Sequence, residues 1–576
     1  MTFVAAVAAG DRAVDGLRSQ HAAQVASGHV ALVRHGGHAV AWRTGSPWIA
    51  SHDDGDVLVV VDGRIHNLWS AAAGPAQLLA ARYRSSGAGV AAGLFGDFVV
   101  IVLDRTRGSL LVARDPVGVR PWYRAAAGRW HAGASDVATL ASLPLVDTEI
   151  HERVAIEHLA AVTASRGETL HRGITTLAPG ETWRLAAGRA TTRAHHRWRL
   201  DPELDISWDD AAERCRAALD VAVASRLRGG GPVTSELSGG LDSSAVVGTV
   251  VGLGCDDVVA ARLVFDGASA DERSYSDAVA GHWSIPLISS APWMPARDEA
   301  VELTRRMRRP LPDPHFLMFV GLHETLLGRG RPDGLTGLGG DDAFVTAGMG
   351  SRVVSAAKLR QWAVLGALAR SALRHRDEAW TGLLRPMLHH LAPWRGDRLP
   401  TWVRAEAAAR ADLPRLFRRR APRLTGIDAI DERAANLTTG YDAAILQDRA
   451  LVADLVGRRD THPFLDPRLI EATYGLDPWW PSRGGHTRAL QVAAYADRLP
   501  RSVVERRTKA DFSEVFWPQV LDAETLDGVG TGPLAEAGWL DRDGFGQLVA
   551  NAKEGKANAA IPLSRCISLD RWLRTR

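Results

Sequence analysis

The chain of 576 residues contains little cysteine: Cys215, Cys255 and Cys566 are the only three, and they lie far apart in the sequence. This spacing argues against a disulfide framework or a zinc site and fits a reducing compartment. No apolar run approaches the ~18 residues that span a bilayer. The N-terminus also lacks a basic region before its short apolar stretch, so we expect no signal peptide. These absences predict a cytoplasmic protein without a membrane partner.

An excess of charge of one sign is also missing. The 69 basic and 66 acidic residues leave a net charge of +3, so we expect no nucleic-acid partner. Lysine is scarce, since four of the 69 basic residues are Lys and the other 65 (69 − 4) are Arg. A lysine at a chemically special position is therefore unusually informative, because the two side chains are not interchangeable there.

The length excludes a single hydrophobic core, so we expect two or more domains. Residues 1 to about 145 are β-rich and predict a sheet sandwich with a helix around Ala76 to Tyr83. The strands that the pattern predicts there are Val57 to Asp62, Gly96 to Asp104 and Ser109 to Ala113. Residues 146–205 are interpreted as a connection, with a turn at Ala178-Pro179-Gly180.

From about residue 207 the pattern changes to alternating helices and strands. The predicted order is helix, strand, glycine loop, helix, strand, helix, over Asp209 to Arg226, Val233 to Leu237, Ser238 to Asp242, Ser243 to Leu253, Val258 to Phe265 and Arg273 to His282. This alternation predicts a parallel sheet with helices on both faces. Residues 345–430 are predicted to be helical additions to this unit.

The chemistry is expected in the segment Ser235-Glu236-Leu237-Ser238-Gly239-Gly240-Leu241-Asp242-Ser243-Ser244. Paired glycines let the backbone approach a ligand, and the following helix N-terminus attracts an anion. Serine hydroxyls add donors. An acidic residue, Asp242, makes sense in this phosphate cradle with a divalent cation between it and the phosphates. Taken alone, Ser-Gly-Gly would also suit a simple turn that caps a helix.

The full string resembles the pyrophosphate loop of the N-type ATP pyrophosphatases, and its flanks resemble asparagine synthetases. It is not the common P-loop, because the chain contains no GxxxxGK[ST]. Three later segments resemble the same family. They are Asp333-Gly334-Leu335-Thr336-Gly337-Leu338-Gly339-Gly340-Asp341-Asp342-Ala343-Phe344, His462-Pro463-Phe464-Leu465-Asp466 and Arg506-Arg507-Thr508-Lys509-Ala510-Asp511-Phe512.

This resemblance implies a set of site residues. It implies that Asp242 and Asp341 hold Mg²⁺, and that Lys509 stabilises the reacting oxyanion and the leaving AMP. The residues that it places around ATP are Leu237, Ser238, Gly239, Gly240, Asp242, Ser243, Ser244, Leu263, Thr336 and Gly337. A lysine at position 509, in a chain that otherwise prefers arginine, favours a role for a compact point charge. A surface lysine without a role is the alternative.

Several N-terminal segments resemble a class II glutamine amidotransferase domain, which is an Ntn-hydrolase-like α+β sandwich. They are Asp62-Gly63-Arg64-Ile65-His66-Asn67, Leu94-Phe95-Gly96-Asp97-Phe98 and Ala113-Arg114-Asp115-Pro116-Val117-Gly118-Val119-Arg120-Pro121-Trp122-Tyr123. That family attacks glutamine with a cysteine at position 2, where this chain has Thr2. We therefore expect a degenerate glutaminase domain over residues 1–200 and an α/β ATP-pyrophosphatase domain over residues 205–576. A nucleophilic Thr2 hydroxyl is the alternative.

The resemblance implies a ligase that adenylates a carboxylate, releases pyrophosphate and AMP, and joins the acyl group to an amine. Family members without the cysteine include β-lactam synthetases and lasso-peptide macrolactam synthetases. β-Lactam synthetases have Tyr and asparagine synthetases have Glu where this chain has Leu338, which cannot move a proton.

We therefore favour the lasso type, in which the N-terminal amine of a core peptide closes a ring onto an Asp or Glu side chain. The expected partners are the precursor core peptide, a leader peptidase and a leader-binding protein. Amidation of a small substrate, either β-lactam-synthetase-like or ammonia-dependent, stays open, as does a non-catalytic scaffold.

Overall fold

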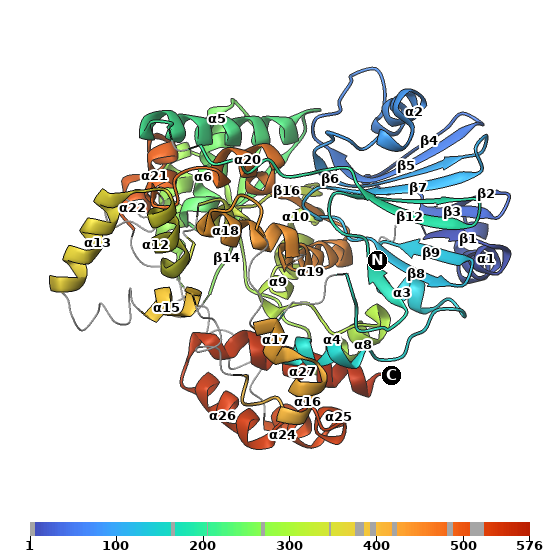
Figure 1. Cartoon of the computed structure of the whole chain (residues 1–576). Coiled ribbons are helices and arrows are strands. Elements are labelled where there is room, and N and C mark those ends of the chain that lie inside the picture. Colours follow the sequence, from blue (N-terminus) through green and yellow to red (C-terminus); the bar gives the residue numbers. More distant parts are fainter. Residues whose placement is uncertain are drawn as a thin grey trace.

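The computed structural model describes residues 6–162, 167–203, 205–265, 271–344, 347–374, 385–391, 399–417, 423–439, 441–480, 488–506 and 523–576. Two of the predicted residues, Thr2 and Lys509, lie outside these ranges. A pair of antiparallel sheets forms one side of the molecule, and a parallel sheet with helices around it forms the other (Figure 1). None of the described helices is long and apolar enough to cross a bilayer.

The N-terminal sandwich consists of two six-stranded antiparallel sheets that pack face to face. The first sheet has the order β10-β8-β9-β1-β3-β2. Its strands are β1 (Ala6–Ala9), β2 (Val30–His35), β3 (His38–Arg43), β8 (Tyr123–Ala127), β9 (Trp130–Ala134) and β10 (Ile174–Thr176). The second has the order β12-β11-β7-β6-β5-β4. Its strands are β4 (Ile49–Asp53), β5 (Val57–Ile65), β6 (Gly96–Asp104), β7 (Ser109–Arg114), β11 (Glu181–Ala186) and β12 (Arg189–Ala194).

Helices cover both outer faces of the sandwich. α1 (Asp11–Ala26) packs with α3 (Val137–Ala141) on the first sheet, and α2 (Pro75–Ser86) packs on the second. Strands β6 and β7 are buried along their whole length, because the first sheet covers one face and α2 the other. Double burial explains why these strands appear in the sequence as continuous apolar runs, and the predicted sandwich is confirmed.

The interpretation of residues 146–205 as a mere connection is wrong. This segment supplies β10 to the first sheet and β11 and β12 to the second. It also forms α4 (Glu152–Leu159), which packs against the helices near the C-terminus and not on the sandwich. β12 is an edge strand with all six residues exposed, so its Arg-Ala-Thr-Thr-Arg-Ala sequence has no apolar alternation from which a strand could be predicted.

The predicted parallel sheet is confirmed, with five strands in the order β15-β14-β13-β16-β17. They are β13 (Val233–Glu236), β14 (Val258–Leu263), β15 (Leu287–Ser290), β16 (Asp333–Leu335) and β17 (Arg459–Thr461). One face is covered by α5 (Trp208–Leu227), α6 (Leu241–Gly252), α7 (Arg273–Trp283) and α21 (Ala489–Tyr495). The opposite side carries α10 (Val320–Gly328) and α19 (Tyr441–Val456).

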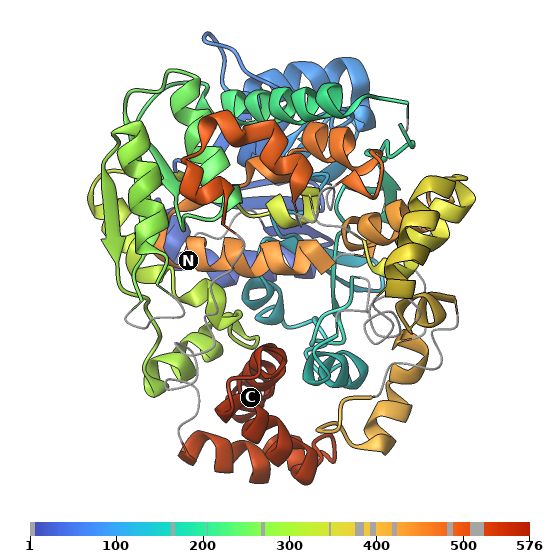
Figure 2. The ribbon, with the colours of Figure 1, turned by 90° about the vertical axis from the view of Figure 1, so that its left-hand side faces the viewer.

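A lobe of short helices lies below the sheet and contains the C-terminus (Figures 1 and 2). Its core joins α4 to α16 (Ala405–Arg410), α17 (Leu413–Phe417), α24 (Ala523–Thr531), α25 (Pro533–Glu536), α26 (Arg542–Lys553) and α27 (Ala560–Arg574). The remaining helices are α8 (Arg297–Met307), α9 (Pro314–Leu317), α11 (Gly340–Phe344), α12 (Met349–Lys358), α13 (Trp362–Arg374), α15 (Arg385–Leu391), α18 (Asp428–Thr439), α20 (Pro467–Tyr474) and α22 (Arg501–Val504), with 3₁₀ turns η1 (Gly87–Gly89), η4 (Pro463–Leu465), η6 (Ala496–Arg498) and η7 (Ala557–Ala559). Where residues 345–430 are described, they are mainly helical, as predicted.

Candidate functional site

The order in which strands are added to the parallel sheet reverses between β13 and β16. β14 and β15 lie on one side of β13, whereas β16 and β17 lie on the other. The segments that leave the carboxyl ends of β13 and β16 therefore begin side by side, and in open α/β sheets ligands bind in the crevice at such a point. The predicted loop, Ser238 to Ser244, follows β13, and the second glycine-rich segment follows β16. Two motifs that are far apart in the sequence thus meet at the position where a ligand is expected.

The first loop has a backbone that requires glycine. Gly239 has a φ of +85°, and a Cβ there would lie 2.5 Å from the Cβ of Tyr275. The amide of Ser238 donates to the Ser243 hydroxyl at 3.2 Å, which closes the turn. α6 starts at Leu241, after an N-cap at Gly240 that makes no side-chain hydrogen bond. Because no side chain caps the helix, its N-terminus keeps the character of an anion site.

The second loop packs directly on the first. A Cβ at Gly337 would lie 2.6 Å from the backbone nitrogen of Ser243, and a Cβ at Gly340 would overlap the Asp242 carboxylate. Both positions therefore require glycine because of close approach and not because of an unusual φ. Asp341 follows Gly340 at once, so this contact brings the second acidic residue to the first.

Asp242 and Asp341 converge on one cation, the guanidinium of Arg488. Nη1 of Arg488 donates to Oδ2 of Asp242 at 2.6 Å, and Nη2 forms an ion pair with Oδ1 of Asp341. Gln491 donates to the other Asp242 oxygen at 2.6 Å. The two acidic side chains are 21% and 48% exposed, so the solvent reaches both. Sequence reasoning missed Arg488 and Gln491, because one arginine among 65 carries no signal.

The donor set fits a divalent cation. Its ligands are carboxylate oxygens, which Mg²⁺ prefers, and the Arg488 guanidinium already marks the position of a positive charge between them. Asp342 adds a third carboxyl group. Burial raises its pKa, and the neighbouring Asp242 charge raises it further. This excess of negative charge would be balanced better by a dication than by one guanidinium.

The other predicted ATP residues fall into two groups. Leu237 and Leu263 lie at the carboxyl ends of β13 and β14, and the Leu237 amide donates to Ala261 at 2.8 Å. Their backbone lies at the same edge as the loop. By contrast, the hydroxyl of Thr336 is engaged with His462 Nδ1 at 2.7 Å. Ser244 is fully buried, and its hydroxyl finds no hydrogen-bond partner in the described chain. These two side chains are not presented at the loop surface.

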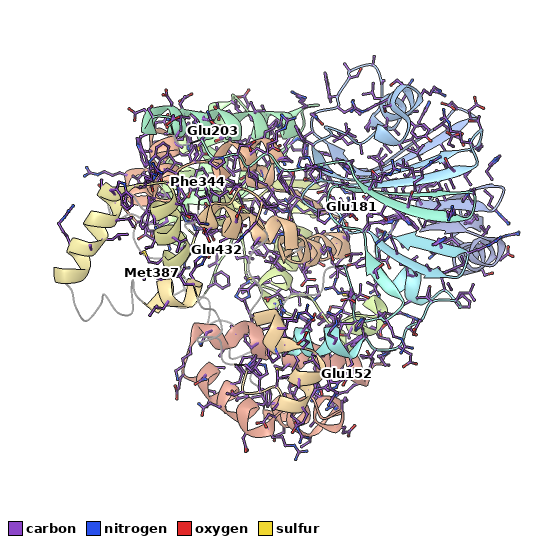
Figure 3. All side chains as sticks on the ribbon, viewed as in Figure 1. Glu152, Glu181, Glu203, Phe344, Met387 and Glu432 are labelled. Atoms are coloured by element: carbon purple, nitrogen blue, oxygen red, sulfur yellow. The ribbon has the colours of Figure 1, made fainter. Side chains whose placement is uncertain are left out.

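Leu338 and the His462-to-Asp466 element belong to the packing around the site. Leu338 is partly buried against an apolar cluster that includes Leu465. The ring of Phe464 stands edge-on to Phe344, with ring centroids 6.1 Å apart, in the core beneath the second loop (Figure 3 labels Phe344). Asp466 pairs with Arg226 of α5 at 2.9 Å. The hydrocarbon side chain of Leu338 has no group that could transfer a proton.

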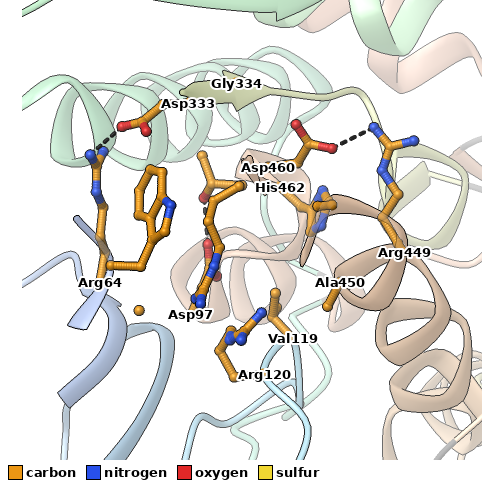
Figure 4. A pocket seen from close by; sticks show the side chains of 15 residues that line it. Arg64, Asp97, Val119, Arg120, Asp333, Gly334, Arg449, Ala450, Asp460 and His462 are labelled. Atoms are coloured by element: carbon orange, nitrogen blue, oxygen red, sulfur yellow. Dashed lines mark hydrogen bonds and ion pairs between the residues drawn. The ribbon is translucent and has the colours of Figure 1, made fainter. Parts of the chain in front are cut away.

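A second set of charges lies between the sandwich and the parallel sheet, and two of its members, Arg120 and Arg459, line a cavity of about 40 Å³ (Figure 4 labels Arg120). Asp62 accepts from Arg120 at 3.0 Å and from Arg459 at 2.8 Å, and Arg120 also pairs with Asp454 at 3.1 Å. We call these four residues the interdomain cluster. Asp62 is fully buried. Burial alone would raise its pKa, but the two arginines outweigh this and hold the pKa below its usual range.

Glu236, at the end of β13, lies with His323 and Asp460 in a group that could in principle hold a metal ion. However, the Arg449 guanidinium donates to both carboxylates, at 2.6 Å to Asp460. Burial would raise the pKa of Asp460, yet the charges of Arg449 and its neighbour Arg458 hold it well below the usual value. Arg449 and Arg458 therefore compensate the charge of this group, whose Asp460 side chain is buried, whereas Asp242 and Asp341 are partly exposed.

Comparison with known proteins matches this architecture. A model of the asparagine synthase family matches residues 214–574, and one of the glutamine amidotransferase domain matches residues 8–198. The chain belongs to the asparagine synthase family. The glycine loop, Asp242, Asp341 and Arg488 all lie in its asparagine synthase part, and Asp62 and Arg120 lie in its glutamine amidotransferase part.

Individual relatives in this family are distant. "Asparagine synthetase [glutamine-hydrolyzing] 3" of Bacillus subtilis (strain 168) is 28% identical over 162 residues, which are 28% of this chain and 26% of that protein. "Putative asparagine synthetase [glutamine-hydrolyzing]" of Mycobacterium tuberculosis (strain CDC 1551 / Oshkosh) is 28% identical over 193 residues, 32% of this chain and 30% of that protein. The matched segments thus span less than a third of these relatives.

Among solved structures, the glutamine phosphoribosylpyrophosphate amidotransferase of B. subtilis, complexed with ADP and GMP, has a TM-score of 0.24 and 12% identity. That match covers 51% of this chain and 69% of the other.

Proposed function

We propose that this member of the asparagine synthase family is an ATP-dependent carbon–nitrogen ligase. It would activate a substrate carboxylate as an adenylate, with release of pyrophosphate, and then join the acyl group to an amine, with release of AMP. The observation that carries this proposal is the meeting of Asp242 and Asp341 around one positive charge, beside a glycine loop at the switch point of the sheet.

Each part of the site has a task in this reaction. The backbone of the Ser238-to-Ser243 loop and the N-terminus of α6 would bind the phosphates and keep the leaving pyrophosphate in line. A Mg²⁺ ion held by Asp242 and Asp341 would neutralise charge that develops on that leaving group. Lys509 would stabilise the oxyanion of the second step and the departing AMP.

The amine is proposed to arrive with the substrate. Position 2 is Thr2, and no cysteine precedes Cys215, so the N-terminal domain lacks the usual nucleophile for releasing ammonia from glutamine. Thiolate chemistry is also far easier than hydroxyl chemistry at neutral pH. An amine and a carboxylate carried by one molecule would then react to close a ring.

Leu338 favours an α-amine as the nucleophile. An N-terminal amine has a pKa of about 7.7–8.0, so a useful fraction is neutral near pH 7.5, whereas a lysine-type amine at about 10.4 is almost fully protonated. A site with leucine instead of a proton acceptor therefore suits the N-terminus of a peptide. We propose a lasso-type macrolactam synthetase, which joins the N-terminal amine of a core peptide to an Asp or Glu side chain. A leader peptidase and a leader-binding protein are its proposed partners.

Pyrophosphate release tests this proposal. Full-length protein with ATP and Mg²⁺ should release pyrophosphate with a leader-free precursor peptide, and the peptide should lose the mass of one water. The same peptide with an acetylated N-terminus should not close. Small amino acids as good substrates would instead favour β-lactam-synthetase-like or ammonia-dependent amidation. Absence of pyrophosphate with every carboxylate tried would favour a scaffold.

A further inference from the structure

Arg488 occupies the position at which a cation is expected between Asp242 and Asp341. This placement indicates that Arg488 takes part in cation binding. Its side chain is 15% exposed and lies between Asp242 and Asp341. Gln491, one turn along α21, accepts from the same guanidinium nitrogen at 3.4 Å and donates to Asp242 at 2.6 Å. The guanidinium is thus held by a small network and does not extend into solvent.

Helix α21, which follows Arg488 directly, is anchored by its packing. Arg488 directly precedes α21, whose residues Leu490, Ala494 and Tyr495 are buried in the core of the parallel-sheet domain. The Tyr495 hydroxyl donates to the carbonyl of Cys215 on α5 at 3.1 Å. Movement of the helix would break this packing, so a change of partner by Arg488 has to come from rotation of its own side-chain bonds.

A divalent cation bound between Asp242 and Asp341 would compete with the guanidinium for the two carboxylate oxygens that Arg488 contacts. The positive charge of the guanidinium would also repel a dication bound next to it, because charges in a partly buried site are screened less than in water. Entry of the ion therefore requires the guanidinium to leave. Asp242 is the second residue of α6, so the released guanidinium starts beside the phosphate loop. Its forked N–H donors match phosphate oxygens better than any other side chain.

We infer that Arg488 is an exchange residue: it bridges Asp242 and Asp341 while no divalent cation is bound, and it turns to the phosphates of ATP when the cation takes its place. The inference rests on the proposed ATP and cation site, and it adds a regulation of that site. The bridge keeps two acidic residues from repelling each other in the empty protein. The bridge also weakens the binding of a cation that arrives without ATP. The cation and the nucleotide therefore bind more favourably together than either does alone.

The test compares the affinity for the metal alone with the affinity for nucleotide. Mn²⁺ is titrated into full-length, nucleotide-free protein and followed by the paramagnetic resonance of the free ion. Arg488→Met should bind Mn²⁺ about fivefold or more tightly, because the competing guanidinium is gone, and Mg-ATP about fivefold or more weakly, because a phosphate contact is lost. Arg216→Ala, which removes an exposed ion pair with Asp497 on the outer side of α5, is the control and should leave both affinities unchanged.

Opposite changes in the two affinities are the signature, since a merely structural role would weaken both. Unchanged or weaker Mn²⁺ binding by Arg488→Met overturns the exchange, and unchanged Mg-ATP binding overturns its phosphate half. If Arg488→Met does not fold, Arg488→Lys serves instead, because one ammonium cannot form the two-pronged bridge and should also give tighter Mn²⁺ binding. Neither titration needs a peptide or turnover. Normal exchange without ring closure would therefore contradict the proposed function alone, and ring closure without exchange would contradict this inference alone.

Discussion

Two arginine–carboxylate clusters of this molecule, the interdomain cluster and the one at the switch point of the parallel sheet, use the same chemical groups in opposite ways. In the interdomain cluster Asp62 and Arg120 have side chains that are 0% and 3% exposed, and each charge is paired within the chain. In the switch-point cluster, which consists of Asp242, Asp341 and Arg488, the carboxylates are 21% and 48% exposed. Exposed pairs contribute little to stability, whereas breaking a buried pair is costly.

This contrast separates residues that hold the fold from residues that are available to a ligand. The interdomain cluster ties the glutamine amidotransferase part to the asparagine synthase part. The switch-point carboxylates stand at the ends of glycine loops, where a partner other than Arg488 can reach them.

The largest effect on activity is expected from Asp242→Ala, which removes a carboxylate of the switch-point cluster. We expect it to lower pyrophosphate release by about 10³-fold or more, since a lost metal ligand removes several kcal/mol of transition-state stabilisation. The thermal midpoint should change by no more than about 2 °C, because the side chain is partly exposed. Steady-state pyrophosphate assays and thermal unfolding measure the two effects. An unimpaired enzyme would refute the assignment of Asp242 to the metal.

The opposite pattern is expected from Asp62→Ala. Removing this carboxylate leaves Arg459 and Arg120 with less charge compensation in a buried place, which should lower the free energy of unfolding by about 3–5 kcal/mol. Denaturant unfolding of the purified variant measures the loss. At temperatures where the variant stays folded, the Mg-ATP affinity should match that of the wild type. A loss below about 1 kcal/mol would show that the cluster does not hold the two parts together.

Asp466 is a further buried carboxylate that is paired with an arginine, and acid titration can measure what it contributes to stability. Burial would raise its pKa, but hydrogen bonds from Arg468 and the charge of Arg226 hold it at about 2. A carboxylate with a depressed pKa adds stability above its unfolded pKa of about 3.9, and this contribution is lost as the pH falls towards 2. We expect wild-type stability to fall by about 2 kcal/mol more than that of Asp466→Asn between pH 5 and pH 2. Parallel urea titrations would show this difference, and equal acid slopes would contradict it.

The sequence predicted those elements whose signal is local. Strand β13 and the loop after it were found because an apolar run meets paired glycines, and the observed strand ends one residue before the predicted one. α6 starts at Leu241, two residues before the prediction, because Gly240 occupies its N-cap. Such errors reflect cap geometry, which the sequence pattern does not fix.

The elements that were missed depend on contacts between distant segments. β16 and β17 have three residues each, too few for any periodicity, and they pair although Leu335 and Thr461 are far apart in the sequence. The meeting of Asp242 and Asp341 was expected from a family resemblance. By contrast, Arg488 could be assigned to the site only from the structure, because its role depends on its contacts with Asp242 and Asp341.

The smallest effect is expected at the N-terminus. If the glutamine amidotransferase part contributes contacts but no chemistry, Thr2→Ala should leave peptide-dependent pyrophosphate release within about twofold of the wild type, because a hydroxyl that takes no part in the reaction does not stabilise its transition state. Addition of glutamine should increase pyrophosphate release by neither the wild type nor Thr2→Ala. The assay is the same as for Asp242→Ala, so the two variants form a matched pair from the two parts of the chain. A clear loss with Thr2→Ala would mean that the hydroxyl acts as a nucleophile and that both parts carry chemistry.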